Sequence, residues 1–114
     1  LFPCFLKVDI EGSEYRILDE IIKFDKLFTG LIIEFHNVDL HLKIILEFIK
    51  KLDLTLVHIH PQNPAPVTID NIPTQLEITF SKNPEVIGNL PRIPHKLDMP
   101  ANPDFQEIDL VFET

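Results

Sequence analysis

Two kinds of sequence pattern alternate through the first sixty residues, and this order constrains the fold more than any other feature. Short apolar runs occupy residues 5–10, 31–35 and 54–60. Between them, residues 13–28 and 38–52 carry apolar side chains every three or four positions, which is the spacing of an amphipathic helix. A strand–helix–strand–helix–strand order predicts parallel strands joined by right-handed crossovers. We therefore predict an α/β fold with three parallel strands and helices between them.

The second half of the chain is rich in proline. Nine of the ten prolines fall at or after Pro61, so we expect loops to dominate this half. Two further apolar runs, at 76–80 and 108–112, predict a fourth strand and a short last strand. The chain therefore divides into a strand–helix unit at 1–60, a loop with the fourth strand at 61–82, and a proline-rich surface tail at 83–114.

Composition and charge exclude several classes of protein. A hydrophobic content of 45% and a charged content of 25% are those of a globular domain with a real core. The net charge of −8 argues against nucleic acid and anionic membrane surfaces as partners. No apolar run approaches the ~18 residues that a transmembrane helix needs. The single cysteine excludes an internal disulfide and fits a reducing compartment, so we expect a cytoplasmic protein. The chain begins with Leu1, which suggests a piece of a longer protein.

Polar residues collect where the three predicted parallel strands end. In an open α/β sheet, ligands bind in the crevice beyond the carboxyl ends of the strands. The side chains that this rule brings to one rim are Asp9, Glu11, Glu34, His36, Asn37, His58, His60 and Asn63. The grouping holds only if the strands are parallel.

Two of these acids have a structural alternative. Asp9 could belong to a site, or it could accept hydrogen bonds from the backbone amides of the next helix, and the sequence leaves both open. Glu34 lies inside an apolar strand and therefore needs a partner. It could face the cleft or pair with Lys7 on the neighbouring strand.

A family pattern is present in two segments, FLKVDIEGSEYRIL at 5–18 and GLIIEFHN at 30–37. The pattern is a strand ending in K-[IV]-D-[IV]-E-G, then [AS]-E and a helix, and then an apolar strand with an internal Glu. With it, the sequence resembles the FkbM-type methyltransferases, which depend on S-adenosylmethionine and have a Rossmann-like fold. Later stretches that are also similar to members of this family are HIHPQN, LEITF and LDMPANP.

The resemblance implies a seven-stranded sheet of which this chain holds strands four to seven. Strands four, five and six would be the runs at 5–10, 31–35 and 54–60, and the run at 76–80 would be an antiparallel strand seven between five and six. The implied methyl donor of the parent protein is S-adenosylmethionine, and the acceptor is a hydroxyl of a small molecule or sugar. The family's glycine-rich cofactor loop follows strand one, so we expect this fragment to be inactive alone.

The resemblance also suggests which residues do the chemistry. Some related methyltransferases hold a divalent metal with an Asp after strand four and an Asp-Asn pair after strand five. Asp9 matches the first position and His36-Asn37 matches the pair in part, so these three are possible metal ligands. Without a metal, His36 or His58 could act as general base, because imidazole titrates near neutral pH. The expected catalytic residues are Asp9, His36 and His58, and the expected substrate contacts are Glu11, Glu34, Asn37, His60 and Asn63.

Two other functions stay open at this point. Without strand one, the strand at 5–10 has an open edge, so the chain could be a non-catalytic α/β association module that forms a homodimer there. Alternatively, His58 and His60 share a strand face at a spacing that metal sites use. With Asp9 as a third ligand, they could form a small metallohydrolase site.

Overall fold

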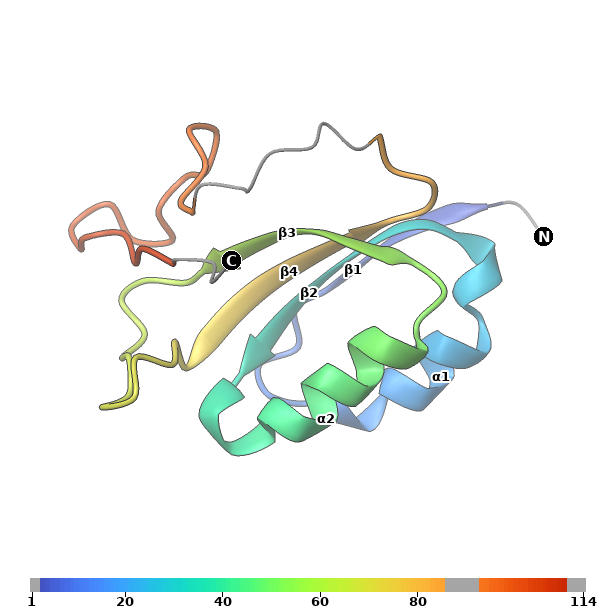
Figure 1. Ribbon diagram of the computed structural model, residues 1–114, viewed down its shortest axis with the longest axis horizontal. Coiled ribbons are helices and arrows are strands. Elements are labelled where there is room, and N and C mark those ends of the chain that lie inside the picture. The colour runs from blue at the N-terminus through green and yellow to red at the C-terminus, as the bar shows by residue number, and fades with distance from the viewer. Residues whose placement is uncertain (1–2, 86–92, 111–114) are drawn as a thin grey trace.

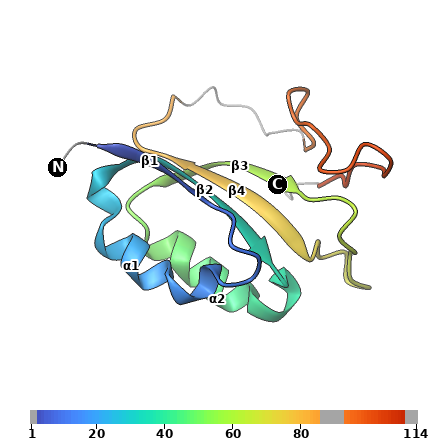
Figure 2. The same cartoon turned by 180° about the vertical axis from the view of Figure 1, so that it is seen from behind.

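The computed structural model describes residues 3–85 and 93–110, which form one α/β unit (Figures 1 and 2). A four-stranded sheet carries both α-helices on one of its faces. The strands are β1 (Cys4–Val8), β2 (Phe28–His36), β3 (Thr55–Pro61) and β4 (Gln75–Ser81). The helices are α1 (Leu18–Lys23) and α2 (Val38–Lys51), with short 3₁₀ helices η1 (Glu14–Arg16) and η2 (Asp25–Leu27) on either side of α1.

The strands lie in the order β1-β2-β4-β3. β1 pairs with β2 in parallel, whereas β4 is antiparallel to both β2 and β3. The prediction of an α/β fold is therefore confirmed, but parallel pairing is confirmed only for β1 and β2. β3 points the same way as β2, since both oppose β4, yet β3 pairs with neither parallel strand. The proline-rich connection after β3 returns the chain as an antiparallel strand in the gap, and this separates β3 from β2.

Alternation along the strands, interrupted by irregular register in β1 and β3, gives the sheet a buried apolar face and a more polar opposite face. On β2, Leu31, Ile33 and Phe35 are completely buried on the side of the helices. The Phe35 ring meets the Phe48 ring of α2 edge-on, with centroids 6.2 Å apart. Residues between these positions, such as Glu34 and His36, point to the opposite face. That polar face carries every expected site residue of β2 and β3.

The predicted helix at 13–28 is wrong in its length. The segment is broken into η1, the six-residue α1 and η2, and its last residue, Phe28, already belongs to β2. Ser13 makes no side-chain cap. Pairing with β1 explains the early end, because residues from Phe28 onward bond to a neighbouring strand instead of adding a helical turn. Asp25 also ties the turn to the next crossover by accepting the backbone N–H of Asp53 at 3.0 Å.

Helix α2 is close to the predicted bounds of 38–52, but the backbone is irregular at its start. Asn37 has a left-handed backbone, with φ of 50°, and makes no side-chain cap. Leu42 in this first part of the helix is partly exposed, whereas Ile45 and Phe48 are buried. The backbone of His41 leaves helical geometry, with φ of −126°, so the first turn of α2 is rotated relative to the rest.

The tail has no long elements between 93 and 110, as predicted. Ile93 and Leu110 form an isolated antiparallel bridge, so the expected strand at 108–112 is reduced to one residue where the structure describes it. Residues 111 and 112 lie outside the described part. Within the described ranges, no helix has the length and apolar character that crossing a bilayer requires.

Candidate functional site

Asp9, Glu34 and His36 come together at the carboxyl ends of β1 and β2, and we call these three residues the rim cluster. Asp9 directly follows β1, while Glu34 and His36 occupy alternate positions on β2 and therefore share a face. Their ligand atoms, one from each side chain, all lie within 4.8 Å of one another. The parallel pairing of β1 and β2 is what brings Asp9 level with the end of β2.

Glu14 fixes the position of His36. Its side chain is completely buried, and it accepts hydrogen bonds from the backbone N–H of Gly12 and of His36, both at 3.0 Å. The same carboxylate lies 3.2 Å from Nδ1 of the His36 ring. Because Nδ1 donates to Glu14, the other ring nitrogen, Nε2, is the one that faces the rim. A carboxylate behind an imidazole in this way sets both its tautomer and its orientation.

Negative charge surrounds Nε2 of His36. This atom is 3.3 Å from Oε1 of Glu34 and 3.7 Å from Oε2 of Glu11. Burial raises the pKa of Glu34, and the nearby Asp9 carboxylate raises it further, while His36 and Gln75 act in the opposite direction. The amide of Gln75, on β4, donates a hydrogen bond to Glu34. A proton or a cation between Asp9 and Glu34 would therefore relieve an unfavourable pairing of charges.

A cleft of about 420 Å³ opens beside His36. Its walls include Glu11, Gly12 and Asn37 on one side and Pro66 and Gln75 on the other. This volume is in the range of small-molecule sites. The cleft places two expected substrate contacts, Glu11 and Asn37, on the same opening as His36.

Tyr15 holds His36, one of the residues that line this cleft, through its backbone. Its hydroxyl donates a 2.5 Å hydrogen bond to the backbone carbonyl of His36, and its ring stacks on His41 with centroids 4.0 Å apart. Burial, together with the nearby acids Glu14 and Asp39, raises the pKa of Tyr15 far above its ordinary value. Tyr15 therefore stays protonated and acts as a donor that holds the end of β2.

The histidines of β3 belong to a separate group. Nε2 of His58 lies 2.8 Å from Asp98, and Nε2 of His60 lies 2.8 Å from Glu107, so both histidines bind the tail. Burial alone would raise the pKa of Asp98, but hydrogen bonds from the backbone N–H of His95 and from His58 hold it below its ordinary value. With β4 between them, β2 and β3 are two strand spacings apart, about 10 Å. His58 and His60 therefore share the polar face with the rim cluster but do not join it.

Asn63 is also taken up by the tail. Its side chain is buried, and its amide nitrogen donates to the backbone carbonyls of Asn102, Phe105 and Gln106. In return, Oδ1 of Asn63 accepts the backbone N–H of Asn102 at 3.0 Å. The amide group is thus committed to holding the tail and is not free for a substrate contact.

Several partners of the expected site residues were not anticipated from the sequence. Glu14 was not among the expected site residues, although its place in the DIEGSE segment is the one signal that could have marked it. Gln75, Asp98 and Glu107 reach their partners across 40 or more residues of chain. No local pattern in the sequence reports contacts of that separation.

The rim cluster fits a divalent cation. Carboxylate oxygens and one imidazole nitrogen are ligands that Mg²⁺, Mn²⁺ and Zn²⁺ accept, in different proportions. Asn37, expected as a metal ligand, is not in the group, and Glu34 takes its place. The alternative set of His58, His60 and Asp9 is not brought together, since both histidines bind carboxylates of the tail.

The two glycines among the described residues do not form the glycine-rich turn that the family resemblance implies for S-adenosylmethionine. Gly30 lies inside β2, where a Cβ atom would come within 2.6 Å of the Phe5 ring. Gly12 is open, with φ of 99°, but it lies at the cleft beside His36 and is a lone glycine there. Comparisons of the chain with protein-family models, with curated proteins and with solved structures found no match.

Proposed function

We propose that this chain supplies the acceptor side of a methyl-transfer site, in which His36 accepts the proton of a substrate hydroxyl. The observation that carries this proposal is the Glu14–His36 pair, which leaves Nε2 facing a cleft of small-molecule size. A histidine whose ring is oriented by a carboxylate in this way is suitably placed to act as a general base. The acceptor class that fits the proposal is a hydroxyl of a small molecule or a sugar.

The strand order supports the same proposal. An antiparallel strand lies between β2 and β3, as it would if β1, β2, β3 and β4 were strands four, five, six and seven of a Rossmann-like methyltransferase sheet. In this proposal the chain is part of an S-adenosylmethionine-dependent methyltransferase. The donor, which would supply the methyl group, is bound by residues other than those described here, and the chain alone is inactive.

Each residue of the site has a role in the proposal. Glu14 holds the His36 ring with Nε2 toward the cleft, and Gln75 keeps Glu34 in place from β4. Asp9, Glu34 and His36 could instead hold a divalent metal through Nε2, which would replace His36 as the activating group by lowering the pKa of a coordinated hydroxyl. Glu11 and Asn37 orient the acceptor from the cleft wall.

The first prediction concerns His36 in the methyltransferase that contains this chain. We expect His36→Gln to lower kcat for methyl transfer by about 100- to 1,000-fold, because general-base catalysis has this magnitude. The measurement is transfer of radiolabelled methyl from S-adenosylmethionine to a panel of sugar and phenolic hydroxyls. His95→Gln is the matched control, since His95 is exposed and its ring lies beside that of His58, outside the rim cluster. Unchanged turnover in His36→Gln, or no calorimetric binding of S-adenosylhomocysteine by the active protein, would refute the proposal.

A second candidate function, association through β1, rests on the position of that strand. Within residues 3–85 and 93–110, β1 is at one end of the sheet and pairs with β2 alone, and Phe5 on it is 57% exposed. Unpaired strand edges of this kind add strands from other chains.

If β1 mediates association, Phe5→Lys should dissociate a dimer of the chain, because a lysine on an edge strand opposes pairing with another strand. Sedimentation equilibrium measures the dimer, with Val57→Lys on β3, at the other end of the sheet, as control. A chain that stays monomeric up to about 1 mM would rule this candidate out.

A further inference from the structure

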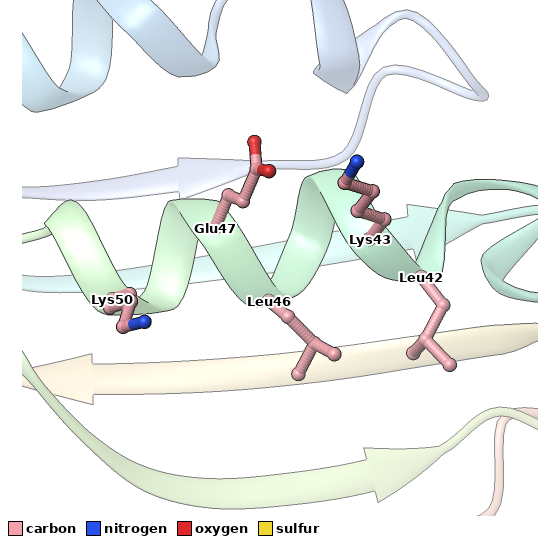
Figure 3. A pocket seen from close by; sticks show the side chains of 5 residues that line it. All are labelled: Leu42, Lys43, Leu46, Glu47 and Lys50. Atoms are coloured by element: carbon pink, nitrogen blue, oxygen red, sulfur yellow. The ribbon is translucent and has the colours of Figure 1, made fainter.

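Helix α2 carries a second apolar stripe that the core does not use. Ile45 and Phe48 are buried against the sheet, whereas Leu42 and Leu46 are 38% and 57% exposed. Figure 3 shows that these two leucines project side by side from one flank of α2, away from Glu47 and Lys43. Together with Lys43, Glu47 and Lys50 they line a hollow of about 460 Å³. Side chains spaced by one turn with a hollow between them can receive the matching ridge of another helix.

The charged residues of α2 begin with an acid and end with two lysines, and between them Lys43 precedes Glu47. Asp39 is exposed at the start of the helix, and Lys50 and Lys51 are at its end. Lys43 and Glu47 lie one turn apart beside the leucines. Two such helices placed antiparallel bring the acidic start of each beside the basic end of the other, and Lys43 beside Glu47. Two placed in parallel would bring like charges together.

We propose that a second copy of this chain docks on this surface, with α2 packed antiparallel against α2 about a two-fold axis. A two-fold contact uses the same patch on both chains, so the patch must be complementary to itself, and the charge order of α2 meets that condition. The antiparallel arrangement also opposes the two helix dipoles favourably. Leu42 and Leu46 of each copy then bury the exposed area that the single chain leaves open.

Sedimentation equilibrium of the chain and of Leu46→Glu tests the contact. We expect a dimer that Leu46→Glu weakens by about 100-fold, because the change removes a buried leucine and adds a charge on both sides of the axis. Leu40→Glu is the matched control, since Leu40 is 75% exposed on the same helix but does not line the hollow. All these side chains are exposed, so circular dichroism should show an unchanged fold.

A charge exchange tests the orientation. Lys43→Glu alone should weaken the dimer several-fold, because it places two acids opposite each other, and adding Glu47→Lys should restore it. A chain that stays monomeric, or a dimer that Leu46→Glu leaves intact, overturns the proposal. A dimer that dissociates only in the Phe5→Lys variant also overturns the proposal, because the contact would then lie on the edge of β1. Failure of the charge exchange to restore a weakened dimer would overturn the antiparallel arrangement.

Discussion

Glu14→Gln is expected to lower the free energy of unfolding by about 3 kcal/mol, more than any other change outside the apolar core. The carboxylate is completely buried and accepts from two backbone N–H groups and from the His36 ring. A glutamine of the same shape puts an NH₂ group where one of these donors points. The result is at least one buried donor without an acceptor. Urea denaturation of the chain measures the loss.

Glu20→Gln is the control for this change. Glu20 is exposed on α1, so its substitution should change the free energy of unfolding by less than about 0.5 kcal/mol. If Glu14→Gln matched this control, the carboxylate would not be the anchor of the rim. The nitrogen chemical shifts of His36 supply a second readout, because its Nδ1 should lose the proton-accepting partner that fixes the tautomer.

The second large effect is expected from divalent cations. Mn²⁺ or Mg²⁺ at 100 times its dissociation constant should stabilise the folded chain by about 2.7 kcal/mol, since the unfolded chain has no assembled rim cluster. Asp9→Asn or Glu34→Gln should abolish most of this stabilisation. Urea denaturation with and without the metal measures it, and Asp19→Asn on the exposed side of α1 is the control. Equal stabilisation of all four proteins would show that the metal binds the acidic surface in general.

Because the pKa of Glu34 is raised, metal affinity should depend on pH. Protons compete with the metal for Glu34, and a raised pKa extends that competition to a higher pH than for an ordinary glutamate. Metal affinity should therefore rise with pH until Glu34 is fully ionised. Without metal, the contribution of Glu34 to folding stability changes with pH in the opposite sense. The folded state holds the Glu34 proton more tightly than the unfolded state does, so this contribution to stability is lost as pH rises through the folded pKa.

Local patterns of apolar residues were sufficient to predict strands β1 to β4. Most features that they did not predict depend on contacts between residues far apart in the sequence. The runs at 31–35 and 76–80 are nearly all apolar or alternate strictly, and both are strands in the structure. The break in the helix at 13–28 depends on Glu14 reaching β2 and Asp25 reaching Asp53, which periodicity does not report. The position of β4 between β2 and β3 was expected only from the family resemblance.

The same distinction between local pattern and distant contact applies to the site residues. Asp9 and His36 could be placed at one rim because parallel strands bring their carboxyl ends together. His58 was expected beside them, but β4 intervenes and the tail supplies Asp98 as its partner, 40 residues along the chain. Asn63 is similarly held by the tail. A sequence read strand by strand gives no sign of which loop returns over a sheet face.

The central claim is that Asp9, Glu34 and His36 act as one site, and paramagnetic Mn²⁺ tests it most directly. In heteronuclear NMR spectra of the chain, substoichiometric Mn²⁺ should first broaden the signals of these three residues and of Gly12 and Gln75 nearby. The His36→Gln variant should lose this selectivity. Broadening that centres on His58 and His60, or that spreads evenly over the acidic surface, would contradict the account.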